Sequence, residues 1–182
     1  HRDRFWFSSN HQSLYRTTDR GLTWTVARDA YPGAIGMGVA FKDSLNGLLS
    51  GDSPGNTGFR RTTDGGVTFS QVGTPKHLTP SFITYVPGTR GAYVASSFDD
   101  WGWAPGSAYT PDEGTTWIPI DSLNHGRSVF LSPTFGWSAG QEGLLYRWGG
   151  ERQQASPALL AVLPGRLDFE NVRPGTQSGA ME

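Results

Sequence analysis

The chain has 182 residues, with 15 Lys and Arg against 16 Asp and Glu and with no Cys. The balanced charge, without a basic run, argues against nucleic-acid binding, and the lack of Cys excludes disulfides, thiol nucleophiles and thiolate metal ligands. The longest aliphatic run, LLAVL at 159–163, is far shorter than the roughly 20 apolar residues of a membrane-spanning helix, so we expect no membrane span.

Short strands and tight turns are expected throughout, because the chain contains 25 Gly and 12 Pro and shows no long amphipathic helix. An eight-residue motif recurs: TTDRGLTW from Thr17, TTDGGVTF from Thr62 and TPDEGTTW from Thr110. The copies begin 45 and 48 residues apart, which is the length of a four-stranded propeller blade.

The predicted strands follow this repeat in chain order. The first motif comes after a strand at 13–16. The second repeat predicts strands at 39–41, 47–50 and 58–61, the third at 83–85, 92–96 and 107–110, and the fourth at 129–131, 136–139 and 144–148. Each motif is thereby placed at the turn from a third to a fourth strand.

The residue types of the motif suit a turn. Its Thr and Asp can accept hydrogen bonds from nearby backbone N–H groups, its Gly permits a positive φ, and its final aromatic ring can pin one blade against its neighbour. We therefore interpret the motif as a folding device and not as a binding site. Its structural residues are Thr17, Asp19, Gly21, Trp24, Thr62, Asp64, Gly66, Phe69, Thr110, Asp112, Gly114 and Trp117.

The motif is similar to the Asp-box, or BNR, pattern Ser/Thr-x-Asp-x-Gly-x-Thr-Trp/Phe of β-propellers such as sialidases, xyloglucan-type glucanases and sortilin-like receptors. The flanking segments SLYRTTDRGLTW and GWSAGQEGLLYRW most resemble the photosystem II assembly factor-like subgroup, the YCF48/HCF136 type. The resemblance covers about residues 4–150 and implies an all-β fold, a β-propeller with four-stranded antiparallel blades. Three to four blades are present, so we expect a partial propeller, with further blades or domains in the same chain.

Three regions follow from this pattern. Residues 1–150 are predicted to form the Asp-box blades, although the fourth repeat reads RWGGERQQ where a motif is expected. Residues 151–165 are predicted to be a linker. Residues 166–182 are either the start of an immunoglobulin-like domain, whose opening strand LDFENVRPG resembles, or a disordered tail.

A candidate site lies in one loop. In Asp-box enzymes, as the resemblance implies, catalysis occurs on the face opposite the motifs, which here predicts loops at 8–12, 28–35, 52–57, 73–80, 98–106, 121–127 and 141–143. The loop in SSFDDWGWAPGS combines Asp99 and Asp100 with Trp101 and Trp103. Such a set suits a carbohydrate, because Trp faces sugar rings and carboxylates accept from hydroxyls. Alternatively, both rings pack onto the blade and the acids are solvated.

Catalysis by this loop would require a second carboxylate. A glycosidase holds two carboxylates about 5–10 Å apart, so Asp99 or Asp100 is a weak catalytic candidate, to be paired with Asp52 or Glu142. The tripeptide RIP of sialidases is absent. The four His residues lack metal-ligand spacing and are expected to be solvated, so we expect no metal and no cofactor.

The sequence therefore favours a non-catalytic binding or assembly module of a bacterial protein, with a carbohydrate or protein ligand. The resemblance implies an exported protein, whether periplasmic, cell-surface or secreted. Two alternatives stay open: part of a glycoside hydrolase whose other catalytic residues lie outside this segment, and a purely structural repeat of a surface protein.

Overall fold

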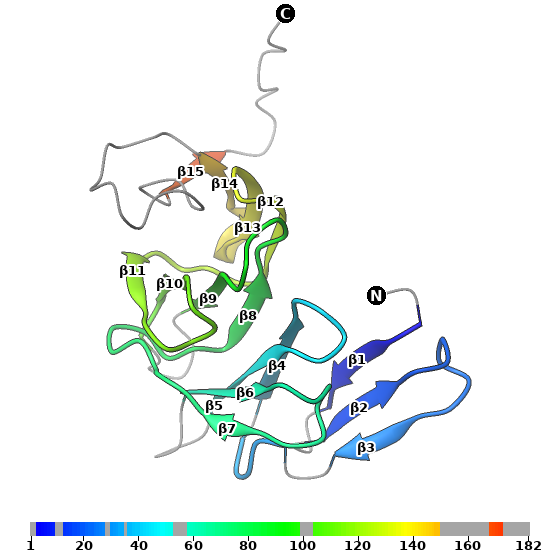
Figure 1. Cartoon of the computed structure of the whole chain (residues 1–182). Helices are drawn as coiled ribbons and strands as arrows, with labels where there is room; N and C mark the ends of the chain where they lie inside the picture. The colour runs from blue at the N-terminus through cyan, green and yellow to red at the C-terminus, as the bar shows by residue number, and fades with distance from the viewer. Residues whose placement is uncertain are drawn as a thin grey trace, which may run out of the picture.

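The computed structural model describes residues 3–9, 13–27, 30–34, 36–52, 58–98, 104–149 and 168–172. Within them the chain forms four antiparallel sheets, each built from consecutive strands (Figure 1). The only helical element of this described part is the short 3-10 turn η1 (Gln141–Gly143), and none of its helices is long and apolar enough to span a membrane.

The sheets follow one another along the chain. The first has three strands, β1 (Phe5–Ser8), β2 (Leu14–Thr17) and β3 (Thr25–Ala27). The second contains β4 (Gly36–Phe41), β5 (Gly47–Asp52), β6 (Gly58–Thr62) and β7 (Ser70–Gln71). The third contains β8 (Phe82–Tyr85), β9 (Tyr93–Ser97), β10 (Gly106–Thr110) and β11 (Ile118–Asp121). The fourth contains β12 (Ser128–Ser132), β13 (Phe135–Ala139), β14 (Leu145–Gly149) and β15 (Asp168–Val172).

Every strand predicted from the sequence is present, with ends that differ by three residues or fewer. The fourth sheet adds a strand that was not predicted there: β15 pairs with β14 from Leu145 opposite Val172 to Gly149 opposite Asp168. The predicted linker at 151–165 lies outside the described residues, as do residues 173–182. The immunoglobulin-like domain or tail at 166–182 therefore stays a prediction.

The motif forms the turn between the last two strands in each of the first three sheets: β2 and β3 in the three-stranded first sheet, β6 and β7 in the second, and β10 and β11 in the third. In the second copy, the Thr62 hydroxyl accepts from the Gly66 N–H at 2.8 Å and donates to Asp64 Oδ1 at 2.8 Å. The Asp64 carboxylate also accepts from the N–H groups of Val67 (2.9 Å) and Thr68 (3.0 Å) and from the Thr68 hydroxyl (2.6 Å). The other two copies repeat the Thr–Gly, Thr–Asp and Asp–Thr bonds.

The fourth and fifth residues of each motif are left-handed. Gly65 and Gly66 have φ of 77° and 88°, and the fourth position holds Arg20 (63°) and Glu113 (59°) in the other copies. In the second sheet the Gly65 N–H donates to Leu45 O at 2.8 Å, a carbonyl in the turn between the first and second strands. In the third sheet the Glu113 N–H donates in the same way to Gly91 O, in the turn between β8 and β9, and in the first sheet the Arg20 N–H donates to Asp3 O, just before β1. The two kinds of turn therefore share one face, which we call the motif face.

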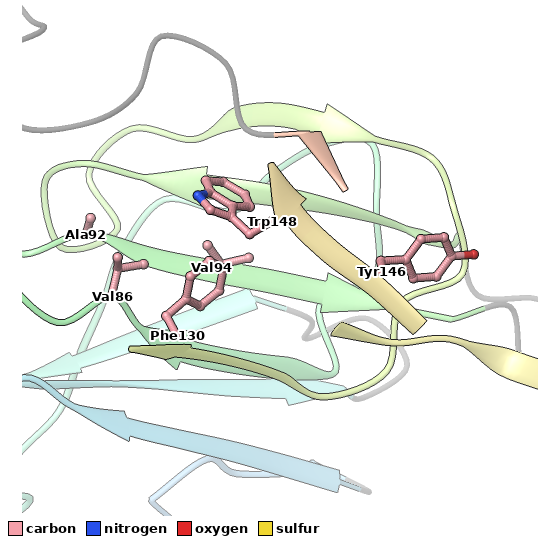
Figure 2. Close-up of a cluster of buried hydrophobic side chains, with 6 residues drawn as sticks. All are labelled: Val86, Ala92, Val94, Phe130, Tyr146 and Trp148. Atoms are coloured by element: carbon pink, nitrogen blue, oxygen red, sulfur yellow. The ribbon is translucent and has the colours of Figure 1, made fainter. Parts of the chain in front are cut away.

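The core lies between successive sheets. We call the side of a sheet that meets the next sheet its forward face, and the side that meets the preceding sheet its backward face. The first interface contains Leu14 and Leu49, the second Leu48, Phe59, Ile83, Tyr93 and Ala95, and the third Val86, Ala92, Val94, Phe130, Tyr146 and Trp148. Figure 2 shows Val86, Val94, Phe130 and Trp148 gathered together, with Tyr146 apart from them at the other end of the cluster. Burial of these rings and aliphatic chains holds the sheets side by side, at about 1.5–3 kcal/mol for each large side chain.

Candidate functional site

The face opposite the motifs carries the loops that the sequence singled out. Asp99, Asp100, Trp101 and Trp103 lie outside the described residues, as do residues 53–57 and the side chains of Asp52 and Glu142. The Asp and Trp site and the carboxylate pair therefore stay predictions. The described parts of this face consist of the loops at 73–80 and 121–127, the turn at 141–143, and the ends of the remaining loops.

The described end of the Asp and Trp loop is anchored on the third sheet. Phe98 is half-buried and stacks on Phe82 with ring centroids 5.7 Å apart. The guanidinium of Arg127, which is exposed, lies 5.2 Å from the centroid of the same Phe82 ring. A cation stacked on an aromatic ring is favourable by about 0.5–1 kcal/mol at an exposed site. Phe98 and the positive charge of Arg127 therefore lie against the same aromatic ring.

A pocket of about 380 Å³ lies between the second and third sheets. We call it the rim pocket; it is lined by Gly73, Thr74, Pro75, Lys76, His77, Thr115, Trp117 and Pro119. Trp117 forms part of its wall, stacked at 4.3 Å on Phe59 of the second sheet. The Trp117 indole N–H donates to Gly73 O at 2.8 Å, which fixes the ring against the loop after β7.

A glycine is required where this loop passes the third motif. A Cβ at Gly73 would lie 2.8 Å from Gly114 O and 2.9 Å from Thr115 O, closer than real Cβ atoms approach backbone. Further along the loop, His77 Nε2 lies 3.1 Å from Ser107 O, and since a carbonyl only accepts, this nitrogen carries a proton. The loop is thereby held at both ends, with exposed Lys76 between them.

The rim pocket combines apolar side chains with one lysine. Trp117, Pro75 and Pro119 offer apolar surface, and Lys76 offers a positive charge at the edge. Its described lining contains no carboxylate and no serine, so these residues offer neither the carboxylate pair of a glycosidase nor a serine nucleophile. Sequence reasoning did not find it because the lining comes from two sheets, and only the packing of Trp117 on Gly73 brings them together.

A second pocket, of about 270 Å³, lies between the connection of the third to the fourth sheet and the turn that precedes β14. Its lining is Ser122, Leu123, Asn124, Gln141, Leu144 and Tyr146. Burial, and in second place the negative charge of Asp121, raise the pKa of Tyr146, so its phenol stays protonated at neutral pH.

Beside this pocket His125 is fully buried, at 0% exposure, which contradicts the prediction of a solvated loop histidine. Its Nε2 lies 3.0 Å from both carboxylate oxygens of Asp121, and its Nδ1 lies 3.2 Å from Ser138 Oγ. Its ring also packs 4.5 Å from that of Tyr146. The prediction failed because the sequence does not show that β13 and β14 fold over this connection.

Asp121, His125 and Ser138 have the residue types of a hydrolytic triad but not its accessibility. Ser138 is 1% exposed, and neither it nor His125 lines the adjacent pocket. A nucleophile must reach its substrate. The three residues instead clamp the end of the third sheet onto β13 of the fourth.

Comparisons with known proteins bear on the fold. No family model and no curated protein matches the chain. A solved structure described as YCF48 bound to D1 peptide is similar over 94% of this chain and 52% of its own, with a TM-score of 0.61 and 21% identity. The xyloglucanase of family GH74 from Xanthomonas campestris is similar over 92% of this chain and 28% of its own, with a TM-score of 0.59 and 16% identity. The GH74 enzyme of Niastella koreensis is similar over 93% of this chain and 28% of its own, with a TM-score of 0.61 and 14% identity.

This chain has a β-propeller fold. Its four sheets are the blades, and the predicted partial propeller is confirmed. The chain spans about half the length of the YCF48 structure and just over a quarter of the two GH74 enzymes. Of the kinds of propeller that the motif and its flanking segments resemble, the YCF48 type and the glucanase type are among the similar structures. At these identities the likeness concerns the fold alone.

Proposed function

We propose that this part of the propeller is a binding module that takes a segment of another protein in the rim pocket. The observation that carries the proposal is the combination of Trp117, Pro75 and Pro119 with Lys76 around one hollow. The apolar residues suit an apolar side chain of the ligand, and Lys76 suits a carboxylate near it. The expected ligand is an extended segment in which an acidic residue adjoins an apolar one.

A protein ligand is favoured over a carbohydrate by two considerations. The similar YCF48 propeller is described as bound to a peptide. The rim pocket also presents a single cation and two prolines, whereas sugar sites rely on carboxylate and amide acceptors for hydroxyl groups. We further propose that the parent protein is bacterial and exported, which fractionation of expressing cells would test.

The test of the rim pocket uses peptides selected from a random display library on the wild-type chain. Their affinity is measured by fluorescence polarisation for wild type, Lys76→Glu and Arg90→Glu. Arg90 is also exposed but lies on the motif face, in the turn between β8 and β9, so it is a control with the same change of charge.

We expect the selected peptides to contain Asp or Glu beside an apolar residue. We also expect Lys76→Glu to weaken binding about tenfold, or ~1.4 kcal/mol, and Arg90→Glu to leave it unchanged. Equal losses in both variants would show non-specific attraction and refute the rim pocket. A folded wild type that selects no peptide would refute the proposal itself.

A second candidate is carbohydrate binding, or hydrolysis with carboxylates outside this segment, by Asp99, Asp100, Trp101 and Trp103. It is motivated by the sequence of that loop and by the fold shared with GH74 enzymes. A glycan array with wild type and a folded Trp101→Ala, Trp103→Ala double variant distinguishes it. Glycan binding that the double variant loses would place the ligand there, and binding of neither peptide nor glycan would leave a structural repeat as the function.

A further inference from the structure

The two ends of the series of blades expose apolar faces. The backward face of the first blade is the side turned away from the second blade. On it Tyr15 is paired with both Phe7 and Val26, and Phe7 meets Trp24 edge to face with ring centroids 5.0 Å apart. Phe7, Trp24 and Val26 are 46%, 41% and 41% exposed. Cross-strand partners lie on one face of a sheet, so these four side chains form one apolar surface, the first-blade end face.

The forward face of the fourth blade is the counterpart. Val129 is paired with Trp137, and Ala139 with Leu145, on the side opposite Phe130 and Trp148. Of the residues on this side, Val129, Leu131, Phe135 and Leu145 are 56%, 70%, 42% and 44% exposed. We call this surface the fourth-blade end face. Such contiguous apolar surface marks an interaction site.

Three internal interfaces show what such faces pack against. At each of them, the forward face of one blade meets the backward face of the next. Trp6 stacks on Phe41 at 3.9 Å between the first and second blades, and Phe59 on Trp117 at 4.3 Å between the second and third. Val94 joins Trp148 in the cluster between the third and fourth.

At the first two internal interfaces a motif aromatic residue packs on a third-strand side chain of the preceding blade. The first-blade end face carries the aromatic residue of this pair, and the fourth-blade end face carries the third-strand side chain. Trp24 occupies the motif position of Phe69 and Trp117, which pack near Leu14 and on Phe59 of the preceding blade. In the segments LYR at 14–16 and 145–147, Leu145 occupies the position of Leu14. Leu14 and Phe59 are fully buried beneath their aromatic partners, whereas Leu145 is not. Among the described residues, Trp24 therefore lacks a third-strand partner, and Leu145 lacks a motif aromatic.

We propose that two copies of this chain join head to tail, with the first-blade end face of each copy packed on the fourth-blade end face of the other. Figure 1 shows the four blades turning through an arc whose ends are β1–β3 and β12–β15. The chain spans about half the length of the YCF48 structure, and the proposed ring therefore holds two copies. The eight blades that result from two copies of four fall within the usual range for propellers.

A head-to-tail interface closes only when the rotation per copy matches a ring. In the proposed dimer each copy spans half of the ring, and both interfaces repeat a contact that the chain already makes three times internally. Blades from elsewhere in a longer polypeptide are the other possible occupant of the end faces, and the test separates the two.

The experiment is sedimentation velocity of the wild-type chain and of Leu145→Asp, Trp24→Lys and Leu45→Asp over a wide range of concentrations. Leu45 is 46% exposed, close to the 44% of Leu145, but lies on the motif face of the second blade, so it is the matched control. Circular dichroism and thermal melting establish that each variant is folded.

We expect the wild type and Leu45→Asp to be dimers. Leu145→Asp and Trp24→Lys should each raise the dissociation constant about a hundredfold, because each places a charge in both interfaces of its homodimer. Mixing these two variants should restore the dimer, since one interface of the mixed dimer is then wild type and the other pairs Asp with Lys.

Three results would overturn the proposal. A folded wild type that stays monomeric would indicate that blades of a longer polypeptide, and not a second copy, cover the end faces. A dimer that survives both substitutions would use another surface. Open oligomers that grow with concentration would show that two copies do not close.

Discussion

Motif aspartates are held in their charged form by the hydrogen bonds that they accept. Bonds from the Thr17 hydroxyl, and then from Thr23, lower the pKa of Asp19 to about 2. For Asp64, loss of solvent alone would raise the pKa, but the bonds from Thr68 and its neighbours outweigh this effect and hold the pKa well below its usual range. A carboxylate that accepts several such bonds favours the ionised state.

This residue-scale effect predicts how acid destabilises the chain. The pKa of Asp64 is lower in the folded than in the unfolded state, so at acid pH the unfolded chain binds more protons. The stabilisation is complete above the unfolded value near pH 4 and is lost as the pH falls through the folded pKa. In urea denaturation at a series of pH values, the free energy of unfolding of Asp64→Asn should be about 1 kcal/mol lower than that of the wild type at neutral pH. It should also fall less steeply than that of the wild type as the pH is lowered. Parallel pH curves for variant and wild type would contradict this assignment.

At the scale of the element, the motif turn depends on two successive left-handed residues. Gly66 has φ of 88°, and a Cβ there would also lie 2.8 Å from Leu14 Cδ2. Gly66→Ala should therefore destabilise the chain by about 1–2 kcal/mol. Arg20, at 63° and without a glycine's freedom, gives the opposite prediction.

Arg20→Gly should stabilise the first motif turn or leave it unchanged, because relief of left-handed strain offsets the exposed ion pair with Asp3. Thermal melting checks both predictions: the melting temperature should fall in Gly66→Ala and should rise or stay unchanged in Arg20→Gly. A large loss in Arg20→Gly would mean that the ion pair, and not the backbone, dominates this position.

Strands could be predicted from the sequence because each motif fixes the start of the next hairpin and apolar alternation fixes the rest. What escaped prediction depends on contacts between distant segments. The strand Asp168–Val172 carries no local sign of its partner Leu145–Gly149. The rim pocket depends on Trp117 meeting Gly73 of another blade, whereas sequence reasoning could weigh only the neighbours Asp99 to Trp103 along one loop.

For the whole molecule, stability depends on how firmly each blade is attached to the next. His125 joins the third blade to the fourth through Asp121 and Ser138, and it is fully buried. His125→Ala should cost about 3 kcal/mol, because it leaves Asp121 and a buried hydroxyl without their partner. His77→Ala, which removes one hydrogen bond from a half-buried ring, should cost about 1 kcal/mol.

Urea denaturation measures both losses. Hydrogen exchange of β12 to β14 should also rise in His125→Ala while that of β4 to β6 does not, because the clamp joins the fourth blade to the third and has no residue in the second. Equal losses for the two histidines would show that the buried clamp adds nothing beyond an ordinary hydrogen bond.

The motif turn also bears on the order in which the chain folds. The hydrogen bonds that its Thr and Asp side chains make, such as those that Thr62 accepts from Gly66 and Asp64 accepts from Thr68, close within eight consecutive residues. Such local contacts form on the microsecond timescale of a hairpin, before any long-range pairing. The three motif turns, once formed, set the register of the strands on either side of them. The later steps of folding then consist of packing hairpins whose strands are already aligned.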